Sequence, residues 1–273
     1  MASVLTKTYL RLCEDIPHFK KTTRKWMYNL MARFIRHDHW TFMNYGYAHI
    51  HPHENIPELD DHDESNRLSF QLYHHLASQV DLKGKTVLEI GSGRGGGASM
   101  INKYHQPDKL VGLDFSANAV KLCSRKHKSD RLSFVEGDAE NLPFEKELFD
   151  AVINVESSHC YNSMARFLKE VKDVLKPGGH FLFTDFRDAE AMPELENTIH
   201  GTEMKIVSKK NITAHVLKAL NEDHHRRLDD IRKSVPRFLV KQFSEFAGVR
   251  DSVIYNEFTN GKTVYFSYVM QKI

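Results

Sequence analysis

Hydrophobic and polar positions alternate in blocks through the middle of the chain. Five short apolar runs, rich in β-branched residues and bounded by turn residues, predict buried strands at 85–90, 109–114, 132–136, 149–154 and 180–186. Apolar residues at helical spacing separate these runs, at 98–104, 117–127 and 163–175. Strands that alternate with helices predict parallel βαβ units in an α/β sheet that is covered on both faces.

The pattern after the fifth strand is different. It predicts helices over 211–220 and over 223–246, the second interrupted near Pro236. Residues 251–258 and 262–270 alternate like two strands, and Asn260-Gly261 between them is a strong hairpin signal. We therefore expect a C-terminal β-hairpin that completes a mainly parallel, seven-stranded sheet.

The N-terminal part is basic, aromatic and helical in pattern over 18–40, and a helix over 69–80 leads into the first strand. We predict a single domain over 1–273. Its expected parts are an N-terminal helical lid (1–65), a core (66–186), a helical cap (187–250) and the C-terminal hairpin (251–273).

Composition narrows the class of protein. The 273 residues are 41% apolar and 27% charged, which is typical of a globular protein, and the net charge of +2 argues against a nucleic-acid partner. Three cysteines are too few for a disulfide scaffold. We find no apolar run of about 18 residues and no signal-peptide core. We therefore expect a cytoplasmic protein, and nothing in the sequence indicates its oligomeric state.

A glycine-rich loop, Gly91-Ser92-Gly93-Arg-Gly95, follows the first strand and opens a helix. Glycines there permit positive φ and let the backbone approach a ligand. The spacing also fits the dinucleotide fingerprint G-x-G-x-x-G, and a tight turn without a ligand has the same pattern. Glu89, two residues before the first glycine, would repel a pyrophosphate and suits a cationic group instead.

Two further acids end the next two strands, at the edge of an α/β sheet where ligands bind. Asp114 can accept hydrogen bonds from ribose hydroxyls, and Asp138 from an adenine amino group above the backbone of Ala139. A cationic amino acid tail, a ribose and an adenine together make S-adenosyl-L-methionine (SAM). We predict SAM as the methyl-donating cofactor and S-adenosyl-L-homocysteine as its product; a nicotinamide dinucleotide is the weaker alternative.

Five ordered motifs resemble those of class I SAM-dependent methyltransferases: Glu89-Ile-Gly-Ser-Gly-Arg-Gly95, Gly112-Leu-Asp114, Gly137-Asp-Ala-Glu-Asn-Leu-Pro-Phe144, Phe149-Asp-Ala-Val152 and Leu175-Lys-Pro-Gly-Gly179. The resemblance implies the Rossmann-like fold of that class. Further segments resemble the phthiotriol/phenolphthiotriol dimycocerosates methyltransferases, which are O-methyltransferases of long lipid alcohols: Asn44-Tyr-Gly-Tyr47, Glu64-Ser-Asn-Arg67, Gly95-Gly-Gly-Ala-Ser99 and Asn154-Val-Glu-Ser-Ser-His-Cys-Tyr161.

The resemblance also implies roles for individual residues. The residues expected at the cofactor are Tyr45, Glu89, Gly91, Ser92, Gly93, Asp114, Phe115, Asp138, Ala139, Asn154 and Glu156. Aromatic side chains suit an apolar acceptor site, so at the acceptor, a hydrophobic small molecule, we expect Trp40, Tyr47 and Tyr161.

The expected reaction needs a group that takes a proton from an alcohol, which typically speeds transfer by about 10²–10⁴-fold. Four histidines lie in the predicted core, and only His159 follows a strand at the ligand edge. We predict His159 as the general base. The alternative is a loop histidine that only shapes the pocket, and Cys160 beside it is better interpreted as a small buried thiol than as a nucleophile.

Other interpretations remain open. His37-Asp-His39 and His49-Ile-His-Pro-His53 lack a paired ligand spacing, so we predict no metal site. The 18–40 segment could make transient contact with a membrane surface, but a lid helix has the same pattern. The predicted activity is O-methylation of a lipid, polyketide or terpenoid-like hydroxyl. C-methylation of a sterol-like alkene and a non-catalytic SAM-binding protein are the alternatives.

Overall fold

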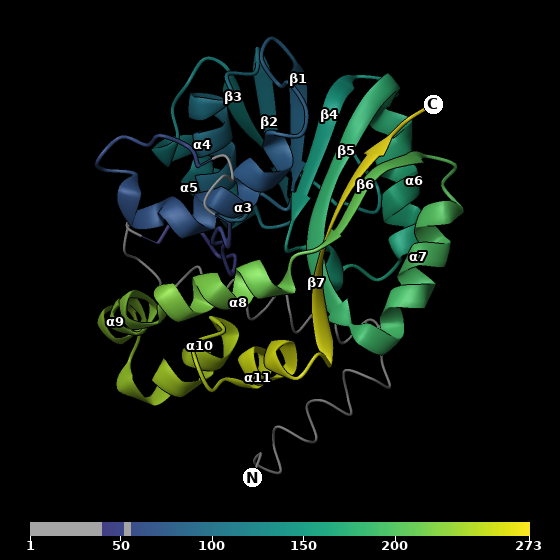
Figure 1. The fold of residues 1–273 in the computed structure, drawn as a ribbon. Coiled ribbons are helices and arrows are strands. Elements are labelled where there is room, and N and C mark those ends of the chain that lie inside the picture. The colour runs from purple at the N-terminus through teal and green to yellow at the C-terminus, as the bar shows by residue number, and fades with distance from the viewer. Residues whose placement is uncertain (1–39, 52–55) are drawn as a thin grey trace.

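The computed structural model describes residues 40–51 and 56–273, which are built around one seven-stranded sheet (Figure 1). Its order is β3-β2-β1-β4-β5-β7-β6; β1 to β5 run parallel, and β7 runs antiparallel to β5 and β6. The strands are β1 Thr86–Ile90, β2 Lys109–Asp114, β3 Leu132–Glu136, β4 Phe149–Val155, β5 Leu175–Asp188, β6 Lys205–Asn211 and β7 Thr263–Gln271. This order confirms the predicted α/β fold with a mainly parallel, seven-stranded sheet.

Helices cover both faces of the sheet. The α-helices are α3 Arg67–Ala77, α4 Gly96–Tyr104, α5 Ala117–Lys126, α6 Met164–Val174, α7 Met192–His200, α8 Thr213–Glu222, α9 His224–Ser234, α10 Val240–Phe246 and α11 Val253–Thr259. The short 3₁₀ helices are η1 Glu64–Asn66, η2 Ser158–Cys160, η3 Ala189–Ala191 and η4 Arg237–Leu239.

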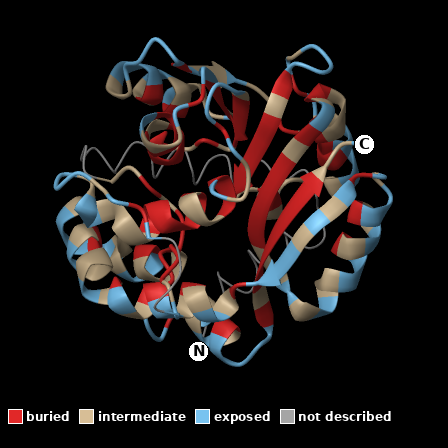
Figure 2. Ribbon diagram, turned by 45° about the horizontal axis from the view of Figure 1, so that its top comes forward, coloured by how far each residue is buried: buried red, intermediate tan, exposed pale blue. Residues whose placement is uncertain are grey.

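The period-2 alternation of β1 explains how one strand serves two cores. Val87 packs into the core formed with α3, α4, α8 and α11, whereas Leu88 and Ile90 pack into the core formed with α6 and α7. Figure 2 shows the strands largely buried and the outer faces of the helices exposed. The same alternation turns Glu89 toward the Val87 face, so a carboxylate lies in an apolar layer.

Local sequence explains where α6 begins and ends. Ser163 caps the helix by accepting a hydrogen bond from the backbone N–H of Arg166 at 3.2 Å. Phe167, Leu168 and Val171 at helical spacing are fully buried against the sheet. The helix ends at Val174, before the Lys-Pro-Gly-Gly segment with which β5 begins.

A second helical layer lies beyond the carboxyl ends of β4 and β5. Figure 1 shows α8, α9, α10 and α11 below the sheet, with β7 rising from this layer. The predicted helices over 211–220 and 223–246 correspond to α8 and to α9 with α10, and the predicted interruption falls at Pro236. We call the layer of α8 to α11 the cap; it overlaps the cap predicted over 187–250, whose role at an acceptor stays a prediction.

The predicted C-terminal hairpin is wrong. Residues 253–259 form helix α11, so β7 pairs with β5 and β6 instead of with a strand at 251–258. Ser252 caps α11 by accepting from the N–H of Tyr255 at 3.3 Å, and Phe258 is buried in the core. The apolar residues of this segment fit a helix once the core is available, and the Asn-Gly turn merely joins α11 to β7.

The seventh strand comes from the region predicted as wholly helical. Lys205–Asn211 forms β6 at the edge of the sheet, antiparallel to β7. Its exposed lysines suit an edge strand, because charge there discourages pairing with other chains.

The N-terminal lid is described only in part. The helix expected over 18–40 lies almost wholly outside the described residues, and within 40–51 the described chain forms no helix. We call residues 40–48 the strap, since this segment joins the loop after β4, through Tyr45 and Glu156, to α8, through Ala48 and His215. Among the described residues, no helix has the length and apolar character needed to cross a membrane.

Candidate active site

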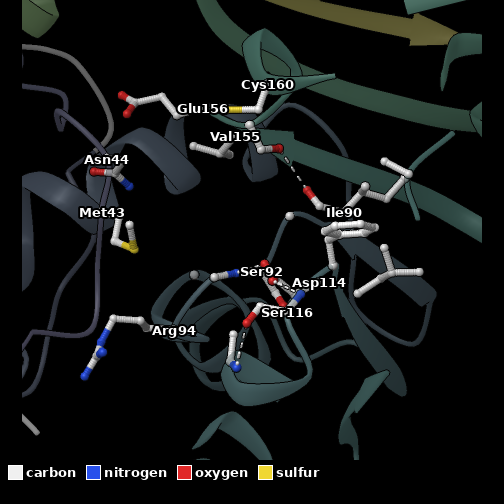
Figure 3. Close-up of a pocket in the computed structure, with 18 of the residues that line it drawn as sticks. Met43, Asn44, Ile90, Ser92, Arg94, Asp114, Ser116, Val155, Glu156 and Cys160 are labelled. Atoms are coloured by element: carbon white, nitrogen blue, oxygen red, sulfur yellow. Dashed lines mark hydrogen bonds between the residues drawn. The ribbon is translucent and has the colours of Figure 1, made fainter. Parts of the chain in front are cut away.

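A pocket lies at the carboxyl ends of β1, β2 and β4, between the sheet and the strap. Figure 3 shows Met43 and Asn44 on one side of it, Ile90 and Asp114 on the other, and Glu156 and Cys160 above. The predicted site residues that line the pocket are Gly91, Ser92, Gly93, Asp114, Phe115, Asp138, Ala139, Glu156 and Tyr161. The structure therefore brings together residues from four predicted motifs.

Positive φ angles and a close contact explain the glycines of this loop. Gly91 has a φ of +80°, and a Cβ on it would lie 2.4 Å from the Ser157 hydroxyl oxygen. Gly93, with a φ of +53°, donates its backbone N–H to the Asp114 carboxylate at 2.8 Å. Asp114 at the end of β2 thus holds the glycine loop in place. Ser157, in the loop after β4, occupies the space next to Gly91.

The two acids at the strand ends form one wall of the pocket. Asp114 accepts a second hydrogen bond from the N–H of Ser116 at 2.9 Å, and burial raises the pKa of Asp114. Asp138 accepts from the N–H of Glu140 at 3.0 Å. Both carboxylates have lone pairs left for hydroxyl or amino donors of a ligand.

Glu89 lies beneath the pocket without lining it. The residue is 1% exposed, and among the described residues neither carboxylate oxygen has a hydrogen bond of good geometry. Burial raises the pKa of Glu89 to about 7, although the Tyr73 hydroxyl and the Ala98 backbone N–H act to lower it. A buried acid with such weak donors and no cation beside it is costly, so this site suits a ligand that brings positive charge, as SAM does.

Glu156 is a second buried acid, and it lines the pocket. It follows β4 with a φ of +46°, a strained conformation for a residue other than glycine. Its Oε1 accepts from the N–H of Tyr45 at 2.8 Å and from the hydroxyl of Tyr265 at 2.6 Å. Burial raises the pKa of Glu156 to about 7. The strap and β7 thereby hold this carboxylate at the pocket.

Asn154 supports the pocket from behind. Its side-chain N–H donates to the Ile90 carbonyl at 2.9 Å and to the Tyr161 hydroxyl at 3.0 Å. The Ser157 and Tyr161 hydroxyls are 2.8 Å apart. This network joins the ends of β1 and β4; Asn154 is not among the pocket-lining residues, and its place at the cofactor stays a prediction.

His159 forms an ion pair with Asp185 beside the pocket. The Nδ1 of His159 is 2.9 Å from Asp185 Oδ1, and Asp185 Oδ2 accepts from the Ser158 hydroxyl at 2.6 Å and from the His159 N–H at 2.9 Å. Burial disfavours the imidazolium, but the Asp185 charge overrides it and raises the pKa of His159 to about 10. Burial would raise the pKa of Asp185, but the charges of His159 and Arg187 hold it well below its usual range.

Aromatic rings surround this ion pair. The His159 ring lies 4.5 Å from the Phe186 ring, centroid to centroid, and Phe186 packs in turn against Tyr45 and Phe258. His159 itself is not among the pocket-lining residues, but its neighbours Cys160 and Tyr161 are. An aromatic environment around a buried ion pair thus adjoins the pocket.

Besides Glu89, Asn154 and His159, three more predicted residues are not among those that line the pocket. Trp40 packs edge-on against Phe243, and its carbonyl accepts from the Arg94 guanidinium. Tyr47 is stacked between His75 and His215, with ring centroids 4.7 and 4.4 Å away. Tyr45 reaches the site through its backbone N–H to Glu156. Roles for Trp40 and Tyr47 at the acceptor stay predictions.

Sequence reasoning missed several residues of this site. Asp185 ends the buried part of β5, the same kind of position that singled out Asp114 at the end of β2. Met43 and Arg94 line the pocket, although neither residue type indicates a ligand on its own. The strap motif Asn44-Tyr-Gly-Tyr47 was the available signal for that wall.

Comparisons with known proteins agree with this geometry. A family model described as a methyltransferase domain matches residues 88–183. The phthiotriol/phenolphthiotriol dimycocerosates methyltransferase of Mycobacterium tuberculosis is 38% identical over 272 residues, which cover 100% of both chains. The fatty-acid O-methyltransferase of Mycolicibacterium smegmatis is 37% identical over 249 residues, 91% of this chain and 89% of that protein.

Solved structures share the fold at low identity. The geranyl diphosphate C-methyltransferase from Streptomyces coelicolor, in complex with S-adenosyl-L-homocysteine, has a TM-score of 0.65 at 14% identity and covers 93% of this chain and 98% of that chain. The cyclase SpnF has a TM-score of 0.69 at 18% identity, covering 90% of this chain and 94% of that chain. These likenesses show the Rossmann-like fold alone, because one neighbour is a cyclase.

The fold, the pocket and the matched domain define a class I SAM-dependent methyltransferase, with SAM as the methyl donor. With 38% identity along its whole length, the chain belongs to the family of the phthiotriol/phenolphthiotriol dimycocerosates methyltransferases. The sequence motifs had predicted both the methyltransferase class and this family.

Proposed function

We propose that this enzyme methylates an oxygen of a hydrophobic, lipid-like small molecule. We also propose that His159 contacts that oxygen, either as the base that removes its proton or as the cation that binds it. Its relatives, a phthiotriol/phenolphthiotriol dimycocerosates methyltransferase and a fatty-acid O-methyltransferase, support this class of acceptor. The observation that carries the proposal is the His159–Asp185 ion pair, at 2.9 Å, in an aromatic environment next to the pocket.

Different acidic residues are expected to bind different parts of SAM. Asp114 and Asp138 would hold the ribose and the adenine, while Glu89 and Glu156 would face the positively charged amino acid end. When bound, SAM would supply the methyl group: the acceptor oxygen would bond to the methyl carbon as the S–CH₃ bond breaks, with S-adenosyl-L-homocysteine as the leaving group. The glycine loop lines the pocket, and the missing side chain at Gly91 lets Ser157 of the loop after β4 lie close against it.

If the acceptor is an alcohol, His159 is the general base. Asp185 fixes the ring through Nδ1, and Nε2 is the atom that would take the hydroxyl proton. Only the neutral imidazole can do this, and the pKa of His159 is raised to about 10. The rate should therefore rise with pH up to about pH 10.

If the acceptor is a carboxylic acid, the same pair has another use. A carboxylate is already ionised near neutral pH, so it needs no base. The His159 imidazolium, stabilised by Asp185, would instead bind and orient the acceptor carboxylate. The raised pKa of His159 favours this second candidate, and the rate would then fall as pH approaches 10.

A paired assay tests both candidates. The enzyme is incubated with labelled SAM and either a long-chain alcohol or the fatty acid of equal length, and products are identified by mass spectrometry across pH 6–10.5. His159→Gln should lower turnover by about 10²-fold or more with the preferred acceptor, while SAM affinity stays unchanged. Full turnover by His159→Gln would refute the role of His159.

The product also tests the remaining alternatives. A methyl group on carbon would indicate a C-methyltransferase, and a methylated protein or nucleic acid would refute the small-molecule acceptor. SAM binding without turnover on either acceptor or on a lipid extract would favour a non-catalytic protein.

A further inference from the structure

The outer surface of the cap carries an exposed aromatic residue in a basic segment. Phe238, in η4 between α9 and α10, is 76% exposed. A single exposed apolar residue is ordinary on a protein surface. The charge around Phe238 is unusual, because residues 231–244 contain four basic residues and no acidic one. These are Arg232, Lys233, Arg237 and Lys241, all of them exposed.

The basic side chains next to Phe238 are not neutralised by neighbours. Within the described chain, Lys233, Arg237 and Lys241 have no ion pair, whereas Arg232 lies 3.8 Å from Asp229. The nearest acids in sequence are occupied elsewhere. Asp230 pairs with Arg226 at 2.9 Å, and Glu245 accepts from the N–H of Val253 at 2.8 Å. Three positive charges therefore remain for a partner.

Helical spacing places these groups together. Arg237 and Lys241 are four residues apart along the continuous η4–α10 helical segment, so they share one side. Leu239 and Val240 turn the opposite way and pack against the small core formed by Ile231, Val235, Phe243, Ala247 and Val249. The face with Phe238 is thus held outward. We call Arg237, Phe238 and Lys241 the cap patch.

The cap patch is connected to the cofactor pocket through that small core. Met43, which lines the pocket, packs against the inner side of the same core, as does Trp40. One layer of buried side chains separates the patch from the strap. A surface bound there would be close to the strap, which lines the cofactor pocket.

We infer that the cap patch docks this enzyme on an anionic lipid surface. An aromatic side chain that enters the headgroup region beside lysine and arginine is the usual combination for interfacial binding. Each cation near an anionic membrane contributes roughly 1 kcal/mol, and burial of the Phe side chain adds more. The surface lies on folded helices and is distinct from the 18–40 segment.

Vesicle binding tests this inference without acceptor or SAM, so its result is independent of the proposed reaction. The full chain is sedimented with vesicles of three parts phosphatidylcholine to one part phosphatidylglycerol, and with phosphatidylcholine alone. We expect binding to the anionic vesicles only, weakening with added NaCl. Arg237→Gln/Lys241→Gln should weaken it by about thirtyfold and Phe238→Ala by about tenfold.

Matched variants on other surfaces serve as controls. Lys109→Gln/Lys128→Gln removes the same charge near the opposite edge of the sheet, and Leu148→Ala truncates another exposed apolar residue. Both should bind like the wild type. Equal losses in patch and control variants would overturn the proposal, as would unchanged binding by the patch variants. A change of oligomeric state in Phe238→Ala, with vesicle binding intact, would assign the patch to a second copy of the chain and also overturn it.

Discussion

At the scale of single residues, the Asp185 carboxylate decides the protonation of His159. It accepts from the imidazole at 2.9 Å and is fully buried, so its charge acts with little screening. Arg187, 3.3 Å from the same carboxylate, keeps it ionised. The pair therefore sets the pH range in which either proposed reaction can run.

Replacement of this carboxylate should move the pH profile. Asp185→Asn keeps the size and an acceptor oxygen but removes the charge, so the pKa of His159 should fall from about 10 to its ordinary range or below, because burial then dominates. For an alcohol acceptor, kcat/KM should reach its plateau at a lower pH, with a plateau about 10²-fold lower because the base is weaker.

Asp173→Asn is the matched control for this prediction. Asp173 pairs with Lys169 on the surface of α6 at 2.7 Å, so its loss should leave both rate and profile unchanged. A profile with the same midpoint in Asp185→Asn and wild type would contradict the prediction, whatever the loss of rate.

The glycine loop yields a second prediction at this scale. Gly91→Ala should abolish measurable SAM binding, because its Cβ would lie 2.4 Å from the Ser157 hydroxyl oxygen. Gly178→Ala has a similar backbone penalty, with a φ of +77°, but its Cβ would meet no atom within 4 Å. It should cost roughly 1–2 kcal/mol in unfolding and leave SAM affinity unchanged, as calorimetry can measure. Equal SAM affinities for the two variants would show that the space over Gly91 is not needed.

At the scale of elements, Arg227 joins the cap to the strap. From α9 its guanidinium donates to the carbonyls of Asn44 and Tyr45 at 3.1 and 3.0 Å, and to Asp223 at 2.9 Å. The strap in turn holds Glu156 and lines the pocket. The cap thus supports the cofactor pocket through one buried cation.

Arg227→Lys should therefore weaken SAM binding although no SAM contact is expected of it. Lysine keeps the charge but cannot serve three acceptors in one plane, so buried acceptors are left unpaired. We expect a melting temperature lower by several degrees and a SAM Kd higher by about tenfold, measured by calorimetry. Arg232→Lys, which alters a surface pair on the same helix, should change neither. A lower melting temperature with unchanged SAM Kd would restrict Arg227 to a structural role.

Elements also show what the sequence could predict. The five parallel strands and the glycine loop depend on local apolar runs and turn residues, so they could be located without knowledge of the rest. β6 could not, because only Ile206 and Val207 are apolar in it and its strand conformation depends on pairing with β7. For 253–259, alternation and helical spacing were both possible, and the Ser252 cap with burial of Phe258 selects the helix.

The site shows the same division between local and long-range information. Glu89, Asp114 and Asp138 each follow from their place at a strand end. The His159–Asp185 pair joins residues 26 positions apart on different elements, so its existence depended on how β4 and β5 lie side by side. The strap is even further in sequence from the residues it contacts: Tyr45 and Glu156 are 111 positions apart.

At the scale of the whole molecule, two buried acids link stability to pH and to the cofactor. Burial raises the pKa values of both Glu89 and Glu156 to about 7, above the ordinary value of 4.5 in the unfolded chain. The folded protein thus binds these protons more tightly than the unfolded one. Their contribution to stability is fully present below pH 4.5 and is lost as pH rises to about 7.

A cationic ligand should restore the stability that is lost when Glu89 and Glu156 ionise, because it stabilises the ionised carboxylates. We expect SAM to raise the melting temperature more at pH 7.5 than at pH 5.5, where the acids are protonated and the SAM ammonium has little to pair with. Scanning fluorimetry at one SAM concentration measures the difference. Glu89→Gln should be more stable than wild type at pH 7.5 without SAM and should gain less from SAM. An equal SAM-induced shift at the two pH values in the wild type would mean that the buried acids do not face the positive charge of the cofactor.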